Sequence, residues 1–195
     1  MRTELIRPRR VRGCVYALLS LAMPLAALAG AGAEPANLHA GHVPVNTVLL
    51  EKVRIFTERY KDIYNATGDG FERGTPCVSG PDFGAMGVHY VNMDRVKKGV
   101  LSADQPQALI YEPLPGGAPH LVGVEYIILA EPWDTANPAK TPELDGNLFN
   151  LVGFPNRFGL PSFYELHVWA WERNPNGTFA DWNTHVTCEH QPGGI

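Results

Sequence analysis

Beyond Gly70, short apolar runs alternate with clusters of Gly, Pro, Asn and Asp, and this spacing limits what the chain can fold into. Runs of this length between turn residues are typical of β-strands. The strand candidates are 87–92, 108–112, 121–129 and 164–172, with weaker ones at 148–154 and 185–188. Residues 113–117 have the composition of a hairpin connection between the second and third candidates. The segment 131–162 is rich in Pro, Asn and Gly, and we expect it to form a long ordered excursion over one end of a sheet.

One segment before Gly70 has a helical period. Its apolar side chains recur at spacings of four and three and form a single stripe: Leu49, Val53, Phe56, Tyr60 and Ile63. Asn46 and Thr47 offer oxygens for the N-cap, and Gly68 can supply a left-handed end. The predicted fold class is therefore α+β, with an N-terminal amphipathic helix packed on a curved, mostly antiparallel β-sheet or small barrel.

The first 33 residues have the order of a secretory signal peptide. Five arginines precede an apolar run from Cys14 to Ala29, and the triplet 31–33 (Ala-Gly-Ala) supplies a cleavage site of the A-x-A type. The apolar run is too short for a membrane span. We expect export to the periplasm or the extracellular space, with no stable membrane insertion after cleavage.

Cleavage after Ala33 removes Cys14 and leaves Cys77 and Cys188. An exported chain with two cysteines is most simply interpreted as having one disulfide. Because these cysteines are far apart in the sequence, the bond would join the start of the β-region to its end.

The mature chain has the length of one domain. We expect a flexible tether over 34–45, a single α+β domain over 46–190 and a tail over 191–195. The whole chain has 16 Lys and Arg against 20 Asp and Glu, and loss of five arginines and one glutamate leaves 11 against 19, a net charge of −8. This acidity argues against nucleic acid as a partner. The oligomeric state is not indicated.

Strand alternation isolates one buried carboxylate. In 121–129 both alternating sets are apolar, so this strand is expected to be central and covered on both faces. Glu125 is the exception, predicted to share a face with Leu121, Gly123, Ile127 and Leu129. A buried carboxylate needs a cation, a metal or a proton, because burying it bare is costly.

Two histidines are predicted on other strands. His89 shares a face with Gly87 and Val91, and His167 shares one with Glu165, Trp169 and Trp171. Convergence of His89, Glu125 and His167 would make a site for a divalent transition metal, as in zinc or non-haem iron proteins. The alternative is that each histidine is hydrogen-bonded separately and that Glu125 pairs with a basic side chain; no short ligand spacing decides between the two.

Other sites of known chemistry are not indicated. The chain has no GxSxG nucleophile elbow, no Walker A sequence and no Rossmann glycine pattern.

Several blocks carry a family resemblance: residues 77–78, 85–92 (AMGVHYVN), 109–113 (LIYEP), 121–126 (LVGVEY), 166–171 (LHVWAW) and 174–179 (NPNGTF). With them, the chain resembles a family of secreted bacterial proteins with no assigned function, from the helix to Cys188. Thr184 stands where that family usually has Pro. The resemblance implies a single exported domain and carries no mechanism.

Three functions are compatible with these residues. The first is a secreted protein that binds a small ligand or a metal ion, with Tyr111, Glu112, Trp169 and Trp171 near the metal ligands. The second is a metal-dependent enzyme on the same residues, with Glu112 or Glu125 as general base. The third is an extracellular interaction module that presents Trp169 and Trp171 to a partner.

Overall fold

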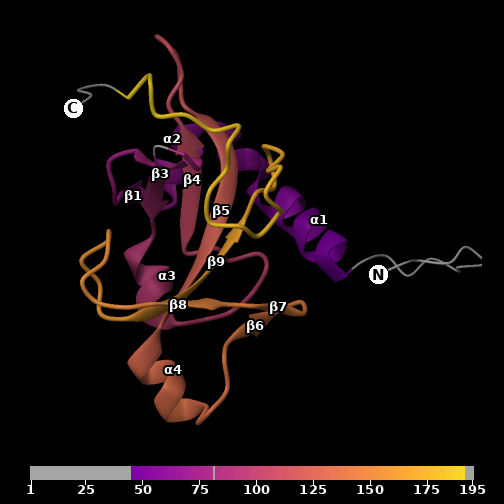
Figure 1. Cartoon of the computed structure of the whole chain (residues 1–195), viewed down its shortest axis with the longest axis vertical. Coiled ribbons are helices and arrows are strands. Elements are labelled where there is room, and N and C mark those ends of the chain that lie inside the picture. The colour runs from indigo at the N-terminus through magenta and orange to yellow at the C-terminus, as the bar shows by residue number, and fades with distance from the viewer. Residues whose placement is uncertain (1–44, 81, 192–195) are drawn as a thin grey trace, which may run out of the picture. The chain divides into compact units, whose positions relative to one another are not determined.

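A computed structural model describes residues 45–80 and 82–191 of the 195-residue chain (Figure 1). The predicted signal peptide lies outside the described residues, as do the tether up to residue 44 and residues 192–195 of the tail.

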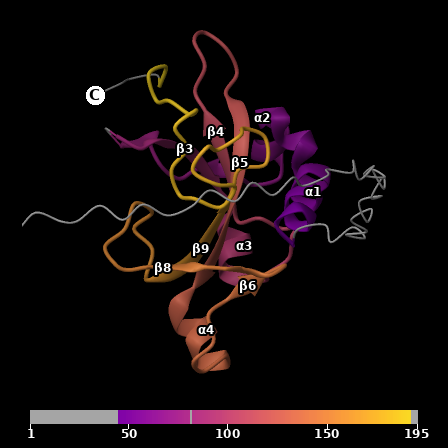
Figure 2. The ribbon, with the colours of Figure 1, turned by 45° about the vertical axis from the view of Figure 1, so that its right-hand side comes forward.

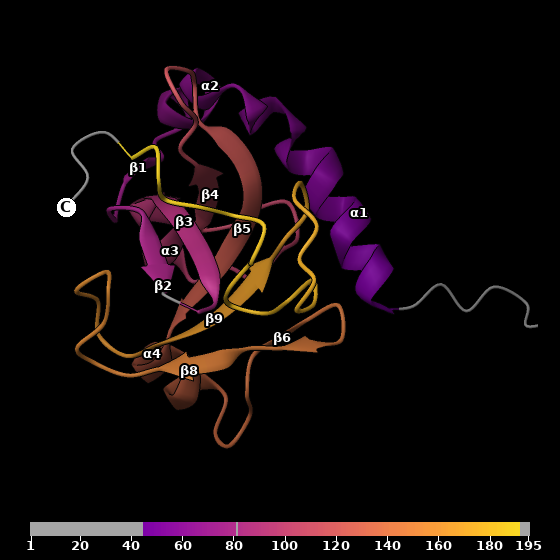
Figure 3. The same ribbon diagram turned by 45° about the horizontal axis from the view of Figure 1, so that its top comes forward.

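The fold is built on a mostly antiparallel sheet of seven strands. The strands are β1 (Glu72–Arg73), β2 (Val78–Gly80), β3 (Gly84–Val91), β4 (Ala108–Glu112), β5 (His120–Leu129), β8 (Asn150–Val152) and β9 (Phe163–Val168). Their order is β1-β3-β4-β5-β9-β8, with β2 paired to β3 (Figure 3). This order begins at β1 and ends at β8, and these two strands do not pair with each other, so no barrel is closed among the described strands.

The remaining elements are short. The hairpin β6 (Glu143–Leu144) and β7 (Asn147–Leu148) forms a separate two-stranded sheet. The helices are α1 (Val45–Thr57), the 3-10 helix η1 (Glu58–Lys61), α2 (Ile63–Gly68), α3 (Met93–Lys98) and α4 (Ala130–Ala136).

The four main strand predictions correspond to β3, β4, β5 and β9. The hairpin over 113–117 is also present, because β4 and β5 pair antiparallel with Glu112 opposite His120. The weaker predictions are less accurate. Of 148–154 only part is β-structure, and 185–188 contains no strand. The excursion 131–162 contains α4 and the strands β6, β7 and β8.

The single predicted helix is divided into three pieces. Asp62 has extended backbone angles (φ −89°, ψ 111°), and its carboxylate accepts a hydrogen bond from the Tyr64 amide, so it caps a new helix. The predicted stripe is wrong at Phe56, which is 47 % exposed. Thr57 is buried instead and donates its hydroxyl to the Val53 carbonyl at 2.6 Å. The left-handed residue is Gly70 (φ 83°), not Gly68.

The two faces of the sheet are covered by different parts of the chain. The larger core contains Leu49 and Val53 of α1 together with side chains of β4, β5 and β9. On the opposite face, Val186 of the C-terminal segment (residues 181–191) packs on Ile110 and Val122. Figure 2 shows this arrangement, with α1 and α2 on one side of β4 and β5 and the C-terminal segment on the other.

The predicted alternation in β5 is correct only beyond Gly123. Pairing of β4 with β5 shifts register between Ile110 and Tyr111, as at a β-bulge. As a result Leu121 joins the larger core with Val124, and Val122 lies on the face of Ile110.

The predicted disulfide is present. Cys77 and Cys188 are bonded across a sequence separation of 111 residues, which joins the start of the β-region to the C-terminal segment. Within the described part of the chain, no helix has the length and apolar character needed to cross a membrane.

Candidate metal centre

The three predicted metal ligands come together on the face of the sheet opposite α1. His89 lies on β3, Glu125 on β5 and His167 on β9, and Glu125 is directly opposite His167 in the pairing of β5 with β9. The three side chains offer ligand atoms that all lie within 4.8 Å of one another. Each residue is at most 1 % exposed. The structure therefore brings together the three side chains whose convergence was one of the two alternatives left open by the sequence.

The distances suit shared coordination. His89 Nε2 lies 3.3 Å from Glu125 Oε2 and 3.5 Å from His167 Nε2. Zinc bonds to imidazole nitrogen and carboxylate oxygen are about 2.0–2.2 Å long, so two ligands at a tetrahedral angle lie about 3.3–3.6 Å apart. Both measured separations are close to that value.

The Glu125 carboxylate has one partnered and one unpartnered oxygen. Oε1 accepts a hydrogen bond from the Arg157 guanidinium at 2.8 Å. Oε2 is buried and makes no hydrogen bond within residues 45–80 and 82–191. This unpartnered oxygen is the one near His89 Nε2.

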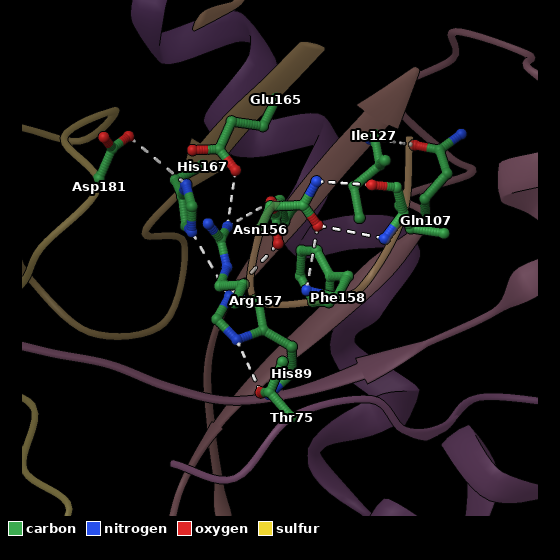
Figure 4. A network of polar contacts seen from close by, with 12 residues as sticks. Thr75, His89, Gln107, Ile127, Asn156, Arg157, Phe158, Glu165, His167 and Asp181 are labelled. Carbon is green, nitrogen blue, oxygen red and sulfur yellow. Dashed lines mark hydrogen bonds and ion pairs between the residues drawn. The ribbon is translucent and has the colours of Figure 1, made fainter. Parts of the chain in front are cut away.

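The far nitrogens of both imidazoles also have polar neighbours. Thr75 Oγ1 lies 3.4 Å from His89 Nδ1 and accepts a hydrogen bond from the His89 amide. Asp181 Oδ1 lies 3.7 Å from His167 Nδ1. In Figure 4, Asp181 approaches His167 from one side of the ring, and His89 and Arg157 lie on the other. Groups at such positions orient metal-binding histidines.

Arg157 is the nearest cation. The same guanidinium nitrogen, Nη2, contacts Glu125 at 2.8 Å and Glu165 at 2.6 Å. The alternative in which Glu125 pairs with a basic side chain is thus present alongside the convergence of the ligands. One arginine between two buried carboxylates leaves one negative charge without a partner cation when both are ionised.

The electrostatics follow from burial. Burial raises the pKa of Glu125 well above its ordinary value, and the charge of Arg157 opposes this only in part. Burial lowers the pKa of His89 well below its ordinary value and lowers that of His167 as well. Burial alone would raise the pKa of Glu165, but the nearby His167 and Arg157 outweigh it and lower that pKa. Burial therefore favours the neutral form of both imidazoles, which is the form that binds metals.

A tight loop holds Arg157 in place. The Asn156 side chain donates to the carbonyls of Gly153 and Leu160 and accepts from the amides of Phe158 and Leu160. Phe158 then packs edge-on against the His89 ring, with ring centroids 5.4 Å apart. The loop between β8 and β9 thus covers the candidate centre.

The other predicted site residues are only partly brought near the ligands. The Trp169 ring stacks on the His167 ring at 6.2 Å, and its indole donates to the Ala180 carbonyl. Tyr111 points into the larger core and donates its hydroxyl to the Tyr60 carbonyl. Glu112 accepts from the Thr187 amide.

Alternation predicted Trp171 on the same face as His167, and this prediction is wrong. Strand β9 ends at Val168, and the indole of Trp171 instead donates to Thr57 of α1 at 3.1 Å.

Sequence reasoning did not identify four residues of this cluster: Thr75, Arg157, Glu165 and Asp181. Glu165 could have been found, because it precedes His167 by two positions and was already assigned to the same face. The other three lie outside the main strands, so no periodicity indicates where their side chains go.

We compared the chain with known protein families, curated proteins and solved structures. No protein-family model, curated protein or solved structure matches this chain.

Proposed function

We propose that this protein is a secreted metal-binding protein that holds one divalent transition metal ion through His89, Glu125 and His167. The observation that carries the proposal is the convergence of these three buried side chains from three strands, with the unpartnered Glu125 Oε2 among them. A mixed nitrogen and oxygen donor set of this kind suits zinc, and also iron or another first-row metal.

Charge supports a cation at this place. When ionised, Glu125 and Glu165 carry two negative charges, and Asp181 beside His167 adds a third. Arg157 supplies one positive charge, and the neutral imidazoles supply none. One divalent ion would bring the group to neutrality, whereas a network held only by Arg157 must keep a proton on a carboxyl.

Secretion is part of the proposal. The signal-peptide pattern of the first 33 residues predicts export, and the disulfide is a bond that persists in oxidising compartments. The resemblance to secreted bacterial proteins points the same way.

The proposal is tested by metal analysis of purified mature protein that is stripped of metal, loaded with zinc and desalted. We expect bound zinc in the wild type and its loss in His89→Ala and His167→Ala, with each variant checked for native circular dichroism. His185→Ala is the matched control, because that imidazole is 48 % exposed and lies outside the cluster. Retention of zinc by both cluster variants would contradict the proposal.

A metal-dependent enzyme is the second candidate, and one observation favours it. Three protein ligands leave a coordination position for water or substrate, as in catalytic zinc sites. Glu112 does not serve this candidate well, because its carboxylate is bound by the Thr187 amide. Azide added to the cobalt-loaded protein should change the visible spectrum if that position is accessible, and an unchanged spectrum argues for a closed binding site.

The interaction-module alternative gains no support. Trp169 is 3 % exposed, and the Trp171 indole is hydrogen-bonded to Thr57, so neither ring is held out toward a partner.

A further inference from the structure

The ring of His167 has polar surroundings at both of its nitrogens. Nε2 lies 3.5 Å from His89 Nε2 and belongs to the candidate centre. Nδ1 faces the opposite way, is buried, and makes no hydrogen bond with the part of the chain that the structure describes. A buried ring nitrogen of this kind is unfavourable unless something binds it.

Two carboxylates lie near the His167 ring, and one of them, Asp181, is beside that nitrogen. Glu165, His167 and Asp181 offer ligand atoms within 4.8 Å of one another, and they form a second group that shares only His167 with the first. Asp181 Oδ1 is 3.7 Å from Nδ1, which is too long for a hydrogen bond. It is close to the separation of about 3.3–3.6 Å expected for two ligands of one ion at a tetrahedral angle.

The position of Asp181 is fixed by its neighbours in the sequence. Asn183 exchanges backbone hydrogen bonds with Ala85, and the Asn174 side chain donates to the Trp182 carbonyl. The Asp181 side chain remains 36 % exposed, so the second group has a route to solvent that the first group lacks.

We propose that Glu165, His167 and Asp181 form a second divalent cation site, and that the His167 ring bridges two metal ions. This inference rests on the proposed function, because the first ion must hold Nε2. Binding of the second ion at Nδ1 displaces the remaining ring proton to solvent, so His167 becomes an imidazolate. The carboxylates of Glu125, Glu165 and Asp181 and the imidazolate then carry four negative charges. The two divalent ions and Arg157 carry five positive charges.

The exposure of Asp181 sets the order of binding. The buried first site fills first and releases its ion slowly, whereas the second ion enters beside Asp181 and exchanges with solvent more readily. Oxygen ligands predominate at the second site, so it also accepts harder cations such as Mn²⁺.

Zinc stoichiometry tests the second site. We expect two ions per chain in the wild type and one in Asp181→Asn, an isosteric change at a partly exposed position. Asp94→Asn is the matched control, because that exposed carboxylate belongs to neither group, and it should keep two ions. One ion in the wild type would overturn the second site. This holds if Asp181→Asn leaves the affinity for that ion unchanged. It also holds if Asp181→Asn lowers that affinity by changing the orientation of His167.

A second readout tests the bridge. With two Cu²⁺ ions per chain, a shared imidazolate couples the two spins, so we expect the electron paramagnetic resonance signal to fall below that of two isolated ions. Asp181→Asn should show the full signal of one ion. Two uncoupled ions in the wild type would overturn the bridge. Absence of metal from the wild type would overturn the proposed function and this inference together, whereas one ion in the wild type leaves the proposed function standing.

Discussion

Among single residues, Glu125 has two roles, as the partner of Arg157 and as a candidate metal ligand. Each of its two carboxylate oxygens serves one of these roles. Oε1 accepts from Arg157, and Oε2 lies toward the histidines. The sequence predicted its burial correctly, since a lone carboxylate stood within an apolar strand. Its cation could not be predicted, because Arg157 lies 32 positions away in a loop.

Glu125→Gln separates these roles. The amide keeps the size of the side chain and an oxygen that can accept from Arg157, so we expect a small loss of stability in the metal-free protein. Glu125→Ala also leaves a cavity and removes a partner of a buried charge, which costs about 3 kcal/mol. Urea unfolding measures both. Zinc binding should be lost in each variant, and unchanged stability in Glu125→Ala would refute the burial argument.

Arg157→Met removes the only charge-balancing side chain that contacts both Glu125 and Glu165 among the described residues. We expect the metal-free variant to be less stable than the wild type by a few kcal/mol, because two buried carboxylates then face each other. Zinc should restore much of this loss by supplying the missing positive charge. Thermal unfolding with and without zinc measures the effect; equal losses in both states would contradict it.

At the scale of elements, the strands were predictable because their alternation is local. The period of two grouped His89, Glu125 and His167 with neighbours on their own strands, but it did not show that the three share one face of the sheet. The helix was less predictable, because the Asp62 side chain competes with the helical backbone for the Tyr64 amide. The bulge beside Ile110 depends on pairing with another strand, and no local pattern shows it.

Strand β3 depends on Gly87. Its φ of 83° is in the left-handed region, and an added Cβ would lie 2.8 Å from the Tyr111 carbonyl oxygen. Gly116 in the hairpin has a comparable φ of 63° but open space around it. Gly116→Ala should cost about 1 kcal/mol for the backbone conformation. Gly87→Ala should cost about 1–3 kcal/mol more because β4 must shift. Equal costs in urea unfolding would argue against the close approach.

For the whole molecule, the disulfide closes the C-terminal segment over the face that bears the candidate centre. It was predictable from cysteine counting, whereas the position of Asp181 on the segment it closes was not. Its loop of 111 residues restricts the unfolded chain. Reduction should therefore lower stability by up to about 4–5 kcal/mol.

Thiol titration of the unfolded, unreduced mature protein should find essentially no free thiol. Two free thiols would show that the bond is not formed in solution. Cys77→Ser with Cys188→Ser gives the stability cost without a reductant, and unchanged unfolding in that double variant would contradict the estimate.

The central claim is that one metal ion is shared by three residues from three strands. Anomalous diffraction at the zinc edge, from crystals of the zinc-loaded protein, locates such an ion directly. We predict a peak about 2.0–2.2 Å from His89 Nε2, His167 Nε2 and Glu125 Oε2 together. A fully loaded crystal with no peak within bonding distance of these three atoms would contradict the account.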